Sequence, residues 1–167
     1  MIRSIGDFDL LWSRELEATQ KILKHLSDRS LSQRVDSEGR TLGRLAWHIV
    51  TTISEMMSRT GLTIAGPHPD APVPAVAKDI FRAYNDAAVS LLGEVKSRWT
   101  DATLEETDEM YGEKWKRGAA LTALVLHQTH HRGQMTILMR QAGLEIPGIY
   151  GPARQEWAAF GMKPPAV

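Results

Sequence analysis

The chain has 167 residues, with equal numbers of basic and acidic side chains, 20 of each, and no cysteine. Zero net charge disfavours proteins that bind nucleic acid or anionic lipid through a net electrostatic field, so we expect neither partner. Without cysteine the chain forms neither disulfides nor thiolate metal ligands, so any metal site must use nitrogen or oxygen. The length fits one domain spanning residues 1–167.

The N-terminal region lacks the pattern of a secretory leader. Asp7 and Asp9 interrupt the segment where a leader needs a continuous apolar run. The longest nearly apolar run, residues 119–126, is far shorter than the roughly 20 residues needed to cross a bilayer. We therefore expect a cytoplasmic protein without a membrane-spanning segment.

Apolar periodicity predicts a helix in the first part of the chain. From Asp7, the expected N-cap, to about Leu26, apolar residues recur every three or four positions. Residues 27–40 are polar and turn-rich, so we expect a connection there, with residues 32–35 as the candidate for an extended stretch. Thr41 is expected to cap the second helix.

The second helix is expected to end at Gly61, because glycine suits the left-handed turn that ends helices. Four prolines between Thr63 and Pro74 then exclude a helix and predict a stiff surface loop. A third helix is predicted from about Val76 to Trp99 by its apolar stripe.

The second half of the chain contains the most apolar of the predicted helices. Residues 100–116 are polar and acidic, and their pattern specifies no regular element. The fourth helix is predicted from about Arg117 to Gln141, with Gly143 after its end and a short terminal helix at 154–160. Four helices without a strong strand pattern predict an all-α four-helix bundle, whose long second connection permits a crossover.

Two histidines of the predicted fourth helix face the interior. His127 and His131 lie four residues apart, so they project from one side of a helix, offset by roughly 40°. On a helical wheel their mean direction coincides with Ala120 and Leu138. Four polar residues are expected on the opposite side of this helix: Gln128, Arg132, Thr136 and Arg140.

His48 borders the buried stripe of the second helix, three residues after Leu45 and four before Thr52. Buried polar groups without partners cost on the order of 1–3 kcal/mol each. A shared Zn²⁺, Ni²⁺, Fe²⁺ or Cu²⁺ ion would pair all three imidazoles and leave a coordination position open. The alternative is a chance spacing, since an isolated H-x-x-x-H pair is a weak signal.

Three further polar residues are weaker candidates for the site. His130 could chelate together with His127 at i, i+3, but it projects roughly 100° from the second histidine of the pair, toward a flank where it would line a pocket or contact a ligating ring. Glu55, seven residues after His48, is a candidate general base, although it lies roughly 10 Å along the helix and is more often a solvated charge. Gln134, seven residues after His127, is placed to hydrogen-bond a ligand or a ligating ring.

Two runs of this sequence resemble the DinB-like (DinB/YfiT) four-helix bundle family, and the resemblance spans nearly the whole chain. They are LGRLAWHIV and HQTHHRGQMTILMRQAGL, whose H-x-x-x-H-R-G-Q core is typical of the last helix in that family. The resemblance implies that His48, His127 and His131 bind one divalent metal ion. It also implies an up-down-down-up arrangement, a long crossover between the second and third helices, and a homodimer.

Several members of that family resemble enzymes that use a low-molecular-weight thiol such as bacillithiol or mycothiol. The leading hypothesis is therefore a metal-dependent transferase, in which the ion lowers the pKa of an exogenous thiol and presents thiolate to an electrophilic small molecule. One alternative is a hydrolase in which the ion activates water. The other is a non-catalytic stress-response binding module in which a structural metal ties two helices together.

Overall fold

The computed structural model describes residues 2–166, which are mostly helical. The long helices are α1 (Ile5–Lys24), α2 (Leu42–Ser58), α3 (Ala77–Arg98) and α4 (Arg117–Gln141). The connections contain the short 3-10 helices η1 (Asp28–Ser32), η2 (Ala102–Glu105) and η3 (Arg154–Phe160), and the strands β1 (Thr107–Met110) and β2 (Glu113–Lys116). Within this part of the chain, no helix is both long and apolar enough to cross a membrane.

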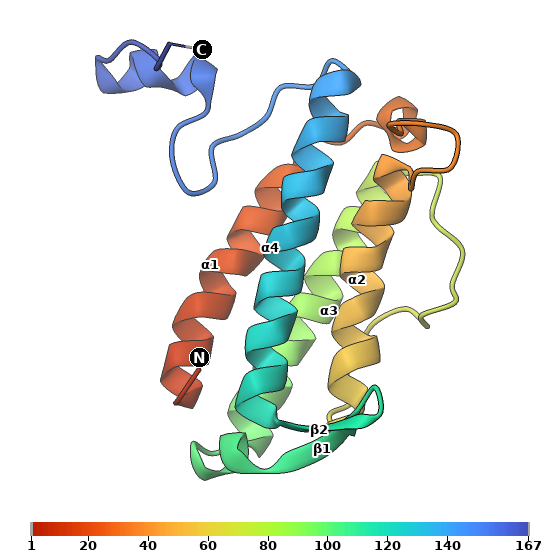
Figure 1. Cartoon of the computed structure of the whole chain (residues 1–167), viewed down its shortest axis with the longest axis vertical. Coiled ribbons are helices and arrows are strands. Elements are labelled where there is room, and N and C mark those ends of the chain that lie inside the picture. Colours follow the sequence, from red (N-terminus) through yellow and green to blue (C-terminus); the bar gives the residue numbers. More distant parts are fainter. Residues whose placement is uncertain (1, 167) are drawn as a thin grey trace.

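The four α-helices lie side by side around an apolar core (Figure 1). α2 packs against α3 and α4, and α1 also packs against α3 and α4. Each helix contributes fully buried side chains to the core, among them Trp12, Ile53, Tyr84 and Met139. The mostly helical fold expected from the sequence is confirmed.

The connection between α2 and α3, residues 59–76, contains the surface loop that the prolines predict. It runs along the outside of the helices, so that α2 and α3 point in the same direction, opposite to α1 and α4 (Figure 1). Two side chains of α2 hold it: the Trp47 indole donates to the Ala71 carbonyl at 2.8 Å, and the Ser54 hydroxyl donates to the Pro67 carbonyl at 3.1 Å.

α1 begins earlier than predicted because Ser4, and not Asp7, is its N-cap. The Ser4 hydroxyl accepts a hydrogen bond from the Asp7 backbone N–H at 2.9 Å, and the Asp7 carboxylate accepts one from the Ser4 N–H at 3.1 Å. This capping box satisfies two backbone donors that the first turn of a helix leaves free. At its other end α1 stops at Lys24, with His25 as the C-cap, and not at Leu26.

The ends of α2 and α4 follow the predicted signals closely. Thr41 caps α2 as expected, its hydroxyl accepting a hydrogen bond from the Arg44 N–H at 3.1 Å. α2 itself ends at Ser58, and Gly61 follows in the left-handed conformation with φ of 79°. Gly143 follows α4 in the same conformation, with φ of 74°. Glycine is favoured at both positions because it has no Cβ to clash.

Two connections differ from the sequence-based expectation. Residues 32–35 form no strand, because η1 occupies the start of that connection. The backbone carbonyl of Gln33 instead accepts a hydrogen bond from the Leu42 N–H at 2.7 Å. The acidic connection after α3 contains an antiparallel hairpin of β1 and β2 that was not predicted. Its two-residue turn, Tyr111 and Gly112, has positive φ at both positions (55° and 86°), as a type I′ turn requires.

Candidate metal centre

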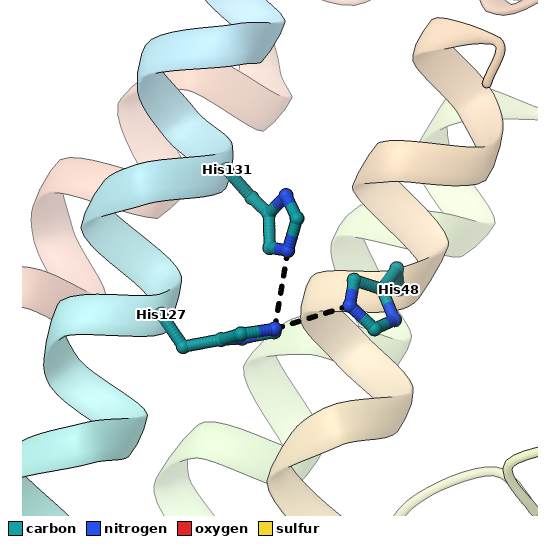
Figure 2. Close-up of side chains that lie close together, drawn as sticks. All are labelled: His48, His127 and His131. Carbon is teal, nitrogen blue, oxygen red and sulfur yellow. Dashed lines mark hydrogen bonds between the residues drawn. The ribbon is translucent and has the colours of Figure 1, made fainter. Parts of the chain in front are cut away.

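Three histidines from two helices meet where α2 packs against α4 (Figure 2). His48 comes from α2, and His127 and His131 come from successive turns of α4. The Nε2 atom of His127 lies 3.1 Å from Nε2 of His48 and 3.1 Å from Nε2 of His131. One ring nitrogen from each residue lies within 4.8 Å of the other two, an arrangement that could hold a metal ion. We call these three residues the histidine triad.

A buried amide fixes the register of the two helices beside the triad. Gln128, which follows His127 in the chain, is fully buried and donates from its side chain to the carbonyl of Ile49, which follows His48, at 2.9 Å. The expectation that Gln128 and Arg132 face away from the core is therefore wrong. Both are buried because α4 packs against α1 as well as α2, so that α4 has more than one inward side.

The two separations at His127 are close to those expected around a first-row divalent ion. Three nitrogens at 2.0–2.1 Å from a tetrahedral ion are about 3.3–3.4 Å apart, close to the separations of 3.1 Å at His127. In a neutral imidazole each nitrogen carries either one proton or one lone pair. The Nε2 atom of His127 therefore makes at most one good hydrogen bond with its two neighbours. A shared ion would instead accept a lone pair from each of the three rings.

The surroundings of the triad favour the neutral form of its imidazoles. Burial lowers the pKa of His48 and of His127 to about 4 each, and neighbouring imidazoles and Arg40 add to the effect. Burial also lowers the pKa of His131, although its hydrogen bond with Gln134 acts in the opposite direction. Because only a neutral imidazole has a lone pair to donate, these shifts favour metal binding at neutral pH.

Gln134 contacts the ligand set directly. Its Oε1 atom lies 2.7 Å from Nδ1 of His131, so this ring donates through Nδ1 and keeps the Nε2 lone pair for an ion. This contact agrees with one of the two roles expected for Gln134. His48 has a weaker partner, the Thr52 hydroxyl at 3.4 Å from its Nδ1. Nδ1 of His127 is buried and has no hydrogen-bond partner among residues 2–166.

The other two candidate residues, Glu55 and His130, do not join the histidine triad. Glu55 makes no hydrogen bond with the triad in the described chain; its carboxylate instead accepts from Arg59 Nη2 at 2.7 Å and from the Tyr111 hydroxyl at 2.6 Å. His130 is exposed, and its ring packs edge-on against that of His131 with centroids 5.0 Å apart. It therefore lies on the flank of α4, as its helical position predicts.

Sequence reasoning missed a cavity of about 420 Å³ that reaches the triad at His131. One side of the cavity is formed by the loop before α2, including Arg40, and the other by residues of α4, including Gln134 and Ile137. The only signal in the sequence is a basic residue directly before the cap of the helix that carries His48. The cavity could not be predicted further, because the position of the loop before α2 relative to α4 depends on tertiary packing.

Comparisons with known proteins cover almost the whole chain. A model of the DinB family matches residues 1–165. The uncharacterized protein YrdA of Bacillus subtilis (strain 168) is 47% identical over 167 residues, which is 100% of both chains. The crystal structure of a DinB-like protein from Bacillus cereus ATCC 10987 is 45% identical and superposes with a TM-score of 0.87, over 90% of this chain and 100% of that one.

A more distant structure shares the fold alone. The DinB-like protein YjoA of Bacillus subtilis is 18% identical, with a TM-score of 0.66 over 85% of this chain and 96% of that one. The family assignment rests on the family match over residues 1–165 and on the relatives that are 47% and 45% identical. On these grounds the chain belongs to the DinB family.

Proposed function

We propose that this DinB-family protein binds one divalent ion, such as zinc, nickel or iron, through His48, His127 and His131 and acts as a thiol-dependent transferase. The observation that carries the proposal is the number of ligands. Three ring nitrogens converge, and no fourth histidine, aspartate or glutamate joins the group within residues 2–166. Catalytic sites keep an open position in this way, whereas structural sites are closed by four protein ligands.

The chemistry proposed is the activation of a small exogenous thiol. A bound ion would lower the pKa of such a thiol and favour thiolate, with the thiol proton passing to solvent. The thiolate would form a C–S bond to an electrophilic carbon of the substrate, while the bond from that carbon to a leaving group breaks and the leaving group departs with its electron pair. The chain has no cysteine of its own to supply the sulfur. The family resemblance points to a thiol of the bacillithiol or mycothiol type. The triad supplies neutral nitrogens, Gln134 orients His131, and the cavity beside His131 offers space for a small molecule.

Each alternative lacks a supporting observation at the triad. A hydrolase needs a base that takes a proton from water, and the candidate Glu55 is held by Arg59 and Tyr111. A structural metal site needs a closed ligand set, and the triad has no fourth protein ligand within the described part of the chain. The transferase is therefore the proposal that the site supports best.

We also propose that the four helices form an up-down-down-up bundle of the DinB/YfiT type, as one domain over residues 1–167. The helix directions in Figure 1 support this arrangement. A homodimer in the cytoplasm is part of the same proposal: Phe160 and Met162 leave apolar surface exposed on the C-terminal segment, and a chain without cysteine suits a reducing compartment. Light scattering should give twice the chain mass of 18.6 kDa, and the mass of a single chain would refute the dimer.

A turnover screen tests the proposed reaction. Protein loaded with zinc, nickel or iron would be incubated with small thiols and electrophiles, and the thioether product measured by mass spectrometry. We expect thiol-dependent turnover that falls by at least about 100-fold in His131→Ala, because loss of a ligand should exceed the 10–100-fold effect of its supporting residues. His68→Ala, an exposed histidine in the crossover, is the matched control.

Two results would overturn the transferase. The first is an absence of thioether with every loaded metal, and the second is equal turnover in the wild type and in His131→Ala. Hydrolysis of the electrophile at the same rate with and without thiol would favour the hydrolase instead.

A further inference from the structure

The cavity beside His131 combines an apolar wall with hydrogen-bond donors. Its volume of about 420 Å³ falls within the range of small-molecule pockets. The apolar wall includes Val35, Leu45 and Ile137. Ile137 is 53% exposed, which leaves a large apolar side chain facing solvent at the rim of the cavity. A ligand with an apolar body would cover this surface.

Arg40 supplies a positive charge to this cavity that no carboxylate neutralises. Arg40 is exposed, and it forms no ion pair with any carboxylate of residues 2–166. Within the described residues 2–166, no aspartate or glutamate lines the cavity. The cavity is therefore electropositive before any metal ion is added.

Gln134 gives the cavity a second donor. Its Oε1 atom is already engaged by Nδ1 of His131, at 2.7 Å. The amide NH₂ of Gln134 is therefore the end that remains for a ligand, since a glutamine carries one acceptor oxygen and two N–H donors. Together with the guanidinium of Arg40, this makes a donor set without a competing acid.

We propose that this cavity binds a small organic carboxylate, with its anionic group on Arg40 and its apolar body against the wall that includes Ile137. A guanidinium matches a carboxylate through two parallel N–H···O bonds. A single arginine suits a monoanion better than a phosphate, which carries more charge and more acceptor oxygens. The inference rests on the proposed function in one respect: the carboxylate would belong to the electrophilic substrate. Its binding to the cavity does not require the metal.

Calorimetric titration with simple fatty acids tests the ligand class. Butanoate, hexanoate and octanoate would be titrated into chelator-treated and into metal-loaded protein, with hexylamine as the probe of opposite charge. We expect the affinity to rise about fourfold for each added methylene until the wall is filled. Hexylamine should bind at least about tenfold more weakly than hexanoate, since it places a cation beside Arg40. Equal affinity for the amine, or no dependence on chain length, would overturn the proposal.

Substitution of the arginine tests the anion site. Arg40→Ala should raise the Kd for hexanoate at least about tenfold, as expected for loss of a charged hydrogen-bond partner, and Arg40→Lys should restore part of the affinity. Arg140→Ala is the matched control, because Arg140 is exposed on α4 and bonds only to the Thr136 carbonyl, at 3.3 Å. An unchanged Kd in Arg40→Ala, in protein with the wild-type melting temperature, would refute the role of Arg40.

The metal content of the same samples separates this inference from the proposed function. If hexanoate binding depends on Arg40 but the wild type binds no metal, only the proposed function fails. If metal binds and thiol transfer occurs while Arg40→Ala binds hexanoate normally, only the carboxylate site fails.

Discussion

At the scale of single residues, the imidazoles of the triad are held in the form that binds metal. His48 and His127 are half-buried and His131 is buried, and burial is the largest cause of the lowered pKa at each of them. The same shifts have a consequence for the metal-free protein. A base whose pKa is lower in the folded state than in the unfolded state makes folding less favourable once the pH falls below its unfolded pKa.

The metal-free protein should therefore lose stability as the pH is lowered from 7 to 5. The unfolded imidazoles take up protons below about 6.5, whereas folded His48 and His127 resist protonation down to about 4. Urea unfolding in the presence of a chelator would measure the effect. The double variant His48→Gln/His127→Gln should show a flatter dependence between these pH values, and an equally steep one would contradict the assignment.

The sequence predicts the triad and its contact with Gln134, but not Arg40. The i, i+4 spacing places His127 and His131 on one side of α4 by helix geometry alone. The pairing of His48 with them follows from its place in the apolar stripe of α2 and from the family resemblance. Arg40 could not be found in this way, because its position depends on how an irregular loop packs over α4.

At the scale of elements, a buried ion pair joins α1 to α4. Glu15 and Arg132 form a hydrogen-bonded ion pair, with side chains only 7% and 3% exposed. Nη1 of Arg132 also donates to the Thr19 hydroxyl at 2.8 Å, and the Tyr150 hydroxyl donates to the Glu15 carboxylate at 2.9 Å. This network connects α1, α4 and the segment after α4.

Removal of one partner of this pair should destabilise the fold strongly. Glu15→Ala leaves the guanidinium of Arg132 buried without a counter-charge, which costs about 3–5 kcal/mol in free energy of unfolding. Glu17→Ala, at an exposed position of the same helix, should change it by less than about 0.5 kcal/mol. Urea unfolding at neutral pH measures both. A loss of stability in Glu15→Ala no larger than in Glu17→Ala would contradict a structural role for the pair.

The helices could be located from the sequence because the apolar spacing within a single segment is enough to define each of them. Apolar spacing predicts α3 to within a residue at each end and gives both ends of α4 as observed. The apolar spacing does not show that Glu15 and Arg132 form an ion pair. A helical wheel describes a single helix, whereas this contact joins side chains of two helices. The hairpin was missed because charged residues fill most of β1 and β2, which leaves no apolar alternation to detect.

At the scale of the whole molecule, a shared ion would couple the two helices that carry the triad. α2 and α4 are far apart in sequence, and their packing builds both the core and the site. An ion held by both helices binds the folded chain and not the unfolded one, so its binding free energy adds to the stability of the fold.

Removal of the metal should therefore lower the melting temperature. At a free ion concentration 1,000 times the Kd, binding contributes about 4 kcal/mol, which corresponds to roughly 8–16 °C for a chain of this size. Calorimetry of metal-loaded protein with and without a chelator measures the shift. His131→Ala should melt at the same temperature in both conditions, and a chelator effect of equal size in that variant would place the ion elsewhere.

The mostly helical architecture is the feature most completely predicted by the sequence. Apolar stripes locate the four helices, and the prolines between Thr63 and Pro74 locate the loop between α2 and α3. The short helix expected at 154–160 is present as η3, but the placement of this C-terminal segment was less predictable. Residues 154–160 form a 3-10 helix without buried side chains, so no apolar stripe defines how this segment lies against the rest of the chain.

If the histidine triad is a metal site, His48 and the two histidines of α4 bind the same ion. Elemental analysis of untagged protein, loaded with zinc and freed of excess metal, tests it most directly. We expect one equivalent of metal per chain in the wild type and in His68→Ala, and close to none in His48→Ala and in His127→Ala. A full equivalent retained by His48→Ala, or none bound by the wild type, would contradict it.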